Sequence, residues 1–271
     1  MDVVDQIAEI IRTELEPHYA ELAKCRSSEE LEANALYQRL RPFVEEVLTT
    51  LETGDFSSVA APPKAGYRVV AWNLERGIEY DGQLAEFQSH PYLTSGDVFL
   101  LTETDVGMAR SGNRNIARDL ARELGLHYAF TPCYLNLAKG AGIENDAAGK
   151  NDLGLHGNAI LSRYPIRNPR PVFLKNGRDK MRGREKRLGH QTAVVADIEF
   201  PNCELAVCSV HLDAQSRQQH RRDQMRDVLD GLDGRGPTIV GGDWNTTTFN
   251  SSSAFPAIMG FWLRVFMGPD N

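Results

Sequence analysis

The chain has 271 residues, of which 41% are hydrophobic and 25% are charged, so we expect one large folded core and an appendage. No stretch approaches the roughly 18 apolar residues of a membrane span, and residues 1–5 carry acid where a secretory signal carries base. The four cysteines include no CxxC pair, so the sequence indicates neither a zinc knuckle nor a secreted disulfide framework. We therefore expect a cytoplasmic protein without a membrane span.

The acidity of the chain is concentrated near its start. The net charge is −7, but residues 1–55 alone hold 13 acidic and 5 basic side chains. The remaining residues, 56–271, hold 24 acidic and 25 basic side chains. The overall charge therefore excludes neither nucleic acid nor any other anionic substrate for the main body.

Two amphipathic helices are predicted in the first 56 residues. Val4, Ile7, Ile11 and Leu15 have helical spacing, and Pro17 should end or kink that helix. The second helix is predicted to be capped by Ser27, with Glu30 three residues later, and to end before Gly54. Its apolar face is expected to consist of Leu36, Leu40, Phe43, Val47 and Leu51. We expect a helical N-terminal extension over residues 1–56, followed by a proline-containing linker over residues 57–66.

The rest of the chain, residues 67–271, is predicted to be one α/β catalytic domain. Strands are expected at 159–162 and 191–199, and a helix at 115–124 should end at Gly125. Ser216 with Gln219 predicts a capping box for a helix through Met225 and Val228. Strands that alternate with helices favour a layered α/β architecture.

Four apolar, β-type runs each end in a residue that can bind a metal ion or a phosphate. RVVAWN ends at Asn73, DVFLLTE at Glu103, LAVCSVH at His211, and TIVGGDWN at Asp243 and Asn245. Strands that deliver such groups to one rim of a sheet can build a site on rigid supports. This pattern predicts a metal-dependent phosphoester hydrolase.

Each of these residues also has a purely structural interpretation. Glu103 is the predicted magnesium ligand, because Mg²⁺ prefers oxygen ligands, but a lone glutamate after a strand commonly just reaches water. Asp243 and Asn245 lie two apart and share a face of an extended segment, yet Gly-Gly-Asp is also a common turn. His211 after a strand can donate to a phosphate oxygen or be structural, and Asn73 has the same ambiguity.

A basic loop is the main indication of the substrate. Residues 175–187, which include Arg187, contain seven basic and two acidic side chains. Such a loop can bind a polyanion backbone, although solvated basic loops are common and no aromatic side chain is interleaved for base stacking. We expect a phosphoester substrate, with nucleic acid as one candidate.

Together these residues resemble the endonuclease/exonuclease/phosphatase superfamily, which includes deoxyribonuclease I, apurinic endonucleases, neutral sphingomyelinases and inositol polyphosphate phosphatases. The resemblance covers roughly residues 67–250, and its motifs occur in family order. They are WN at Trp72–Asn73, the strand-end Glu103, GNAILSRYPI at Gly157–Ile166, SVHLD at Ser209–Asp213 and GGDWN at Gly241–Asn245. The resemblance implies a four-layer sandwich of two packed mixed β-sheets flanked by helices.

The resemblance also implies a mechanism, in which water attacks in line at a phosphate bound to Mg²⁺, with Mn²⁺ as the alternative ion. Glu103 would be the principal metal ligand, with Asn73 beside it. His211 would contact the scissile phosphate, Asp243 would position or activate the water, and Asn245 would bind phosphate or metal. His156, in a loop expected near the phosphate, and Arg187 are the predicted substrate-binding residues, although an exposed loop histidine without a role is the alternative for His156.

The chain departs from the family pattern at its end. Family members normally finish with a Ser-Asp-His type of motif, whereas this sequence has no histidine after His220. Either the sequence stops before the end of the natural domain or the protein lacks this part of the machinery. The apolar residues 261–267 favour a sequence that is incomplete at the C-terminus. The alternative to a hydrolase is a non-catalytic module that binds a phosphate ligand.

Overall fold

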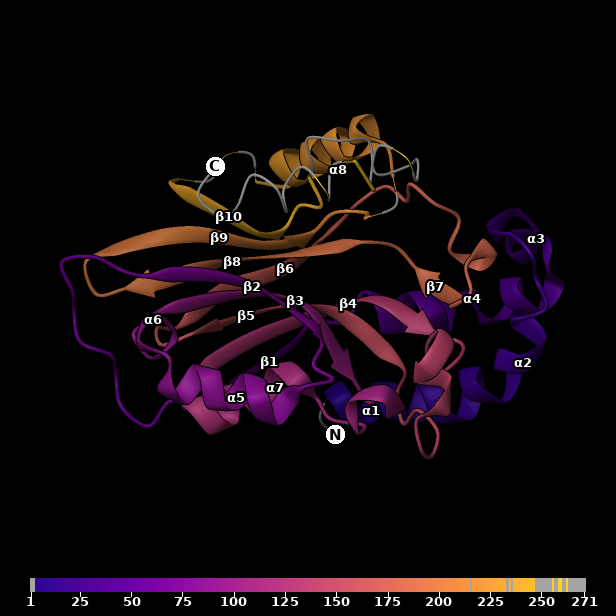
Figure 1. The fold of residues 1–271 in the computed structure, drawn as a ribbon, viewed down its shortest axis with the longest axis horizontal. Helices are drawn as coiled ribbons and strands as arrows, with labels where there is room; N and C mark the ends of the chain where they lie inside the picture. Colours follow the sequence, from indigo (N-terminus) through magenta and orange to yellow (C-terminus); the bar gives the residue numbers. More distant parts are fainter. Residues whose placement is uncertain are drawn as a thin grey trace.

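Two mixed β-sheets pack against each other in the centre of the molecule, and helices cover their outer faces (Figure 1). The computed structural model describes residues 3–246 except 215, 233 and 235, together with residues 255, 258, 259 and 262. The first sheet has the order β1 (Glu52–Asp55), β4 (His127–Asn136), β5 (Leu155–Ser162), β3 (Val98–Val106) and β2 (Val69–Arg76), with β7 (Arg187–Gly189) also paired to β4. The second has the order β10 (Thr238–Asp243), β9 (Cys203–His211), β8 (Thr192–Phe200) and β6 (Ile166–Phe173).

The helices form the two outer layers. Figure 1 shows α8 over the second sheet and α1, α5 and α7 beneath the first. The α-helices are α1 (Val3–Ile10), α2 (Tyr19–Leu22), α3 (Ser28–Ala33), α4 (Ala35–Leu48), α5 (Tyr80–Ser89), α6 (Pro91–Thr94), α7 (Ile116–Leu124) and α8 (Gln218–Gly231). A π-helical turn, η1 (Ile11–Leu15), and a 3₁₀ turn, η2 (Glu16–His18), follow α1, and further 3₁₀ turns are η3 (Ala109–Ser111), η4 (Gly142–Asp146) and η5 (Lys180–Arg182). The predicted four-layer α/β/β/α sandwich is confirmed.

The central strands are buried on both faces, which explains why their sequences are continuously apolar. Side chains from both sheets meet in one cluster, which includes Val98, Leu100, Ile160, Val194, Ile198 and Val207. A second cluster joins the first sheet to the helices beneath it, and a third joins the second sheet to α8. β3 and β9, which carry Glu103 and His211, are therefore fixed by packing on two sides, whereas β2 and β10 are partly exposed edge strands.

The predicted second helix is wrong in its middle and at its end. It is split at Asn34, whose Oδ1 accepts hydrogen bonds from the backbone N–H groups of Leu36 and Tyr37 and so begins a new helix. Ser27 caps the first piece as predicted, because its hydroxyl accepts from the Glu30 N–H. The second piece ends at Leu48, so Leu51 lies outside it.

Residues 52–55 are a strand, so the predicted N-terminal extension is not wholly helical. This strand, β1, pairs antiparallel with β4 at the edge of the first sheet. The buried Glu52 carboxylate makes the pairing possible, because it accepts hydrogen bonds from Asn115 Nδ2 and the Tyr128 hydroxyl. Residues 56–68 then run to β2 without helix or strand. The domain division at residue 57 stays a prediction.

The helix caps of the main body were predicted with mixed success. Asn115 caps α7 by accepting from the Arg118 N–H, and Gly125 ends that helix in the left-handed conformation. The predicted Ser216 capping box is wrong. The Ser216 hydroxyl donates instead to the carbonyl oxygen of Asp213, and α8 begins after Arg217 without a side-chain cap. No helix in the part of the chain described is both long and apolar enough to span a membrane.

Candidate active site

Asn73 and Glu103 lie at irregularities within neighbouring strands, so the prediction that they end their strands is wrong in detail. β2 and β3 pair in parallel as far as Asn73, where the register shifts, and β3 continues to Val106. Glu103 has a φ of 54°, a left-handed backbone that is uncommon for a residue other than glycine. A bulge of this kind redirects a side chain out of the regular alternation. The Glu103 carboxylate therefore faces the rim and not the core.

Asp243 and His211 end adjacent parallel strands, as predicted. β9 and β10 are paired with Asp243 opposite His211. Gly242 makes this approach possible, since a Cβ at that position would lie 2.1 Å from the carbonyl oxygen of Val210. Asn245 follows with a φ of 48°, and its backbone N–H donates to Asp243 Oδ1 over 2.9 Å. The turn therefore fixes Asp243 and Asn245 relative to each other.

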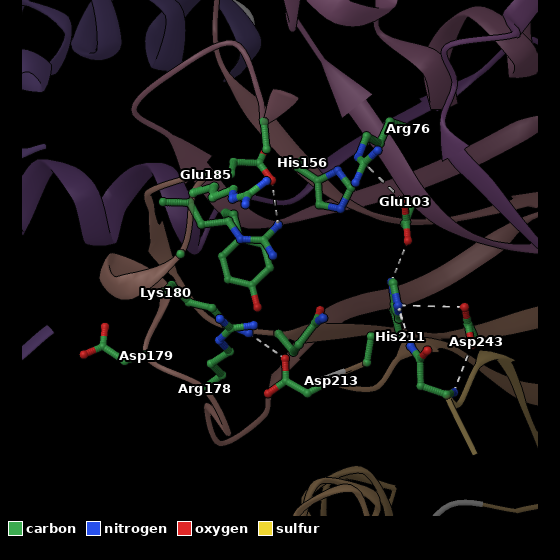
Figure 2. A pocket seen from close by; sticks show the side chains of 18 residues that line it. Arg76, Glu103, His156, Arg178, Asp179, Lys180, Glu185, His211, Asp213 and Asp243 are labelled. Carbon is green, nitrogen blue, oxygen red and sulfur yellow. Dashed lines mark hydrogen bonds and ion pairs between the residues drawn. The ribbon is translucent and has the colours of Figure 1, made fainter. Parts of the chain in front are cut away.

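The five predicted residues of the rim lie together in space. Asn73 Nδ2 donates to Glu103 Oε1 over 3.1 Å and to Asp243 Oδ2 over 2.9 Å, so one amide joins carboxylates from both sheets. Asn245 Nδ2 lies 2.9 Å from His211 Nε2 and donates to the Leu212 carbonyl oxygen. The other ring nitrogen, His211 Nδ1, is 3.7 Å from Glu103 Oε1. Figure 2 shows Glu103, His211 and Asp243 next to one another along one side of a cleft.

Electrostatics favour an ionised Glu103 and a neutral His211. Burial alone would raise the pKa of Glu103, but the imidazoles of His156 and His211 oppose it. With added contributions from Asn73 and Arg76, the pKa of Glu103 falls below its usual value. Burial lowers the pKa of His211, and the nearby carboxylates compensate only in part.

His156 lies on β5 and is buried, so its predicted loop position and the alternative of an exposed histidine are both wrong. Its Nδ1 is 2.8 Å from Oδ1 of the fully buried Asp105. Asp105 also accepts from Nε and Nη2 of Arg110, over 2.7 and 3.0 Å. Burial alone would raise the pKa of Asp105, but His156 and Arg110 hold it below its ordinary value. This carboxylate fixes the orientation of the imidazole at the cleft.

Arg187 lies at the cleft against an aromatic ring. Its guanidinium carbon is 4.2 Å from the ring centroid of Tyr134, and Nη1 is 3.8 Å from Glu185 Oε2. Lys180 approaches the same ring and forms an ion pair with Asp213 over 2.6 Å. Planar stacking of this kind restricts the Arg187 side chain to one orientation.

Six of the seven predicted residues line one large cleft of about 580 Å³. Glu103, His211 and Asp243 line it from β3, β9 and β10, Asn245 from the turn after β10, and His156 and Arg187 from β5 and β7. Asn73 lies behind Glu103 and Asp243, which it connects. The other wall is formed by the loop between β6 and β7, which contributes Arg178, Asp179, Lys180, Gly183, Arg184 and Glu185.

The donors at the rim suit a hard divalent cation. Within the described residues, no three His, Cys, Asp or Glu side chains form a metal-binding cluster. Mg²⁺ does not require one, because it keeps several waters and is commonly held by one or two carboxylates together with substrate phosphate. Two carboxylates, joined by the Asn73 amide, converge here, and carboxylate oxygens fit Mg²⁺ or Mn²⁺ better than Zn²⁺.

Several charged residues of the site were not predicted from the sequence. Asp105 and Arg110 form a buried ion pair behind His156, and Lys180 and Asp213 form another at the opposite wall. The only signal for Asp105 is its position two residues after Glu103, and Arg110 gives none in a single sequence. Both pairs connect segments whose contacts depend on the tertiary fold.

Comparison with known proteins identifies the family. The model of the endonuclease/exonuclease/phosphatase family matches residues 70–270, which is most of the chain. The chain therefore belongs to this family, as its motifs predicted. A search of curated proteins gave no match.

One solved structure supports the fold, and two others are similar at lower scores. An endonuclease/exonuclease/phosphatase from Beutenbergia cavernae DSM 12333 is 20% identical with a TM-score of 0.50, over 73% of this chain and 53% of that one. A family protein from Leptotrichia buccalis C-1013-b is 15% identical with a TM-score of 0.45, over 72% and 74%. A humanized D. rerio TDP2 is 15% identical with a TM-score of 0.43, over 67% and 63%. This chain thus spans about half the length of the Beutenbergia protein.

Proposed function

We propose that this protein is a Mg²⁺-dependent phosphoester hydrolase that cleaves phosphodiesters or phosphomonoesters, with nuclease-like activity favoured. One observation carries the proposal. A single amide, that of Asn73, joins the carboxylates of Glu103 and Asp243 from two different sheets, directly beside His211. Glu103 and His211 lie on β3 and β9, which are buried on both faces near these residues, and this gives the preorganisation that phosphoryl transfer requires.

Glu103 and Asn73 are the residues that would hold the metal ion. Glu103 offers an ionised carboxylate whose position is set by the bulge in β3. When bound, Mg²⁺ neutralises charge on the phosphate and promotes attack by water. Mn²⁺ favours similar oxygen ligands and is expected to substitute.

Asp243 and Asn245 would act on the water and the phosphate. Asp243 would orient the attacking water or accept its proton, because its carboxylate lies at the rim of the cleft. Asn245 would bind a phosphate oxygen or the metal. Its backbone N–H holds the Asp243 carboxylate over 2.9 Å, so the two roles are coupled.

His211 would contact the scissile phosphate. Because its Nε2 lies 2.9 Å from the Asn245 amide, the neutral ring carries its hydrogen on Nδ1. That N–H can donate to an anionic oxygen as charge develops in the transition state. His156, oriented by Asp105, and Arg187, stacked on Tyr134, would bind the substrate further along the cleft.

The test is hydrolysis of a panel of phosphoesters with Mg²⁺, with Mn²⁺ and with chelator. The panel includes bis(4-nitrophenyl) phosphate, 4-nitrophenyl phosphate, single-stranded DNA and RNA. Activity that requires the cation and is lost in Glu103→Gln supports the proposal. Glu199→Gln is the matched control, since Glu199 is exposed on β8 and pairs only with Arg167 in the described structure. Phosphate binding without turnover would instead identify a non-catalytic binding module.

A further inference from the structure

We propose that Arg178 and Arg184 form a subsite for a second phosphate group of the substrate, next to the phosphate that is cleaved. The inference rests on the proposed function, because it names the substrate class of the same cleft. Both arginines lie on the loop between β6 and β7, and both line the cleft.

The first argument is the charge balance of the cleft. Five basic side chains line it, and three of them have a carboxylate as an ion-pair partner. The three pairs are Arg76 with Glu144 at 2.5 Å, Lys180 with Asp213 at 2.6 Å, and Arg187 with Glu185 at 3.8 Å. Arg178 and Arg184 have no ion-pair or hydrogen-bond partner among the described residues. They are therefore the positive charges of the cleft that remain for a ligand.

The acidic residues of the same loop do not cancel these charges, because other groups bind them. Asp179 accepts from the backbone N–H and the hydroxyl of Ser28, at the start of α3. Glu185 accepts from the buried Arg110 over 2.5 Å. Arg178 and Arg184 therefore each precede an acid whose carboxylate is bound by another group.

The loop is held against the N-terminal helices, so the two arginines project from an anchored backbone. Lys186 Nζ donates to the carbonyl oxygens of Ala23 and Cys25, which follow α2. Met181 is buried in the same core cluster as the N-terminal helices. An anchored loop reduces the entropy that must be lost when an anion is bound.

The position of the loop matches an extended substrate. In Figure 2, Arg178, Asp179 and Lys180 lie on the side of the cleft away from Glu103, His211 and Asp243. All of them line the same cavity of about 580 Å³, which is in the range of sites for nucleotide-sized ligands. A ligand with one phosphate at the rim can therefore place a second group at the loop.

The chemistry favours phosphate as that second group. Guanidinium groups present planar forks of N–H donors that match phosphate oxygens, and two of them suit a dianion. A polynucleotide and a small molecule with two phosphates share this chemistry. The length dependence described below distinguishes these two sources.

Binding of nucleotides measured by calorimetry tests the subsite directly. Thymidine 3′,5′-bisphosphate should bind the wild-type protein about tenfold or more tightly than thymidine 5′-monophosphate. The R178Q/R184Q double variant should lose this preference and keep its affinity for the monophosphate. R182Q is the matched control, because Arg182 is an exposed arginine of the same loop that does not line the cleft. Equal affinity for the two nucleotides in the wild type, or an unchanged preference in the double variant, overturns the subsite.

Turnover separates this inference from the proposed function. The 4-nitrophenyl 5′-esters of thymidine 5′-phosphate and thymidine 3′,5′-bisphosphate differ only in the second phosphate. Hydrolysis of both with equal kcat/KM refutes the subsite alone. Binding preference without hydrolysis of either ester refutes the hydrolase alone. With oligothymidylates of increasing length, a kcat/KM that keeps rising beyond two phosphates identifies a polynucleotide as the substrate. A kcat/KM that stops rising at two phosphates identifies a small bisphosphate. Both outcomes support the subsite.

Discussion

The two walls of the cleft are built in different ways. The wall with Glu103, His211 and Asp243 consists of strands whose backbones are fixed by ladder hydrogen bonds, and two of these strands, β3 and β9, are also packed on both faces. The facing wall is a loop that holds its shape through side-chain contacts with the N-terminal helices. The groups expected to perform the chemistry thus depend on the core, whereas those expected to select the substrate depend on a peripheral segment.

Arg110 connects the two walls. Its guanidinium is buried, binds Asp105 on β3, and reaches Glu185 on the loop and Glu144 in η4. The N-terminal helices contribute no side chain to the cleft, yet they fix the loop that does. The comparison predicts that changes in the strand wall reduce kcat and that changes in the loop wall raise KM.

The largest expected effect is a loss of stability when Arg110, which connects the two walls, is replaced. Arg110→Met should reduce the free energy of unfolding by about 3–5 kcal/mol, because it leaves three carboxylates without their buried cation. Urea denaturation measures this loss. Arg12→Met is the control, since its pairing with Glu9 is exposed and should change stability by about 0.5 kcal/mol or less. A stable Arg110→Met protein would mean that the walls are independent.

Breaking the strand wall should affect turnover. Asn73→Ala removes the amide that joins Glu103 to Asp243 and leaves two carboxylates facing each other. We expect kcat to fall by about 100- to 1,000-fold, in the range measured for a preorganised polar group of an active site. Steady-state kinetics on the best phosphoester of the panel tests this, and a change confined to KM would contradict it.

Breaking the loop wall should affect substrate binding. Lys186→Met removes both hydrogen bonds to the chain after α2, each made by a charged donor. We expect KM for a substrate with two phosphates to rise about tenfold with little change in kcat. Lys150→Met is a close control, because Lys150 also contacts the N-terminal segment, through Glu16, but lies outside the loop. Similar effects in both variants would refute a specific role of the loop anchor.

The smallest expected effect is a difference in acid sensitivity. Burial alone would raise the pKa of Asp213, but Lys180 and the Gly177 N–H hold it below its ordinary value. A lowered folded-state pKa stabilises the protein above the unfolded-state pKa of about 3.9, and this stabilisation is lost as the pH falls through the folded-state pKa. The stability gap between wild type and Asp213→Asn should therefore be widest near neutral pH and narrow below about pH 4. Urea midpoints from pH 2.5 to 7 measure it, and a constant gap would contradict the linkage.

Much of the fold could be predicted because its signals are local. Apolar runs identify the buried strands. A polar residue directly after such a run, such as His211, indicates where the strand reaches the rim of the cleft. The position of Asp243 and Asn245 followed from a motif of five residues. Family motifs added the order of these segments and hence the sandwich.

The remaining features depend on contacts distant in sequence. Glu103 was expected at the end of a strand, but pairing on both sides extends β3 beyond it and forces a bulge. β1 is stabilised by hydrogen bonds from Asn115, which caps α7, and from Tyr128 on β4 to the Glu52 carboxylate. No local sequence pattern indicates these contacts. Asp105 and Arg110 form a buried pair only because the fold brings η3 against the end of β3. Such pairings cannot be inferred from one sequence.

The edge strand β1 limits how the protein can be divided. Because Glu52–Asp55 covers the edge of β4 at residues 127–130, a shortened protein that starts at residue 57 would leave those backbone groups unpaired. An open edge of this kind invites association between molecules. A shortened protein that lacks only the N-terminal helices must therefore start between α4 and β1, at residues 49–51, so that β1 remains paired with β4.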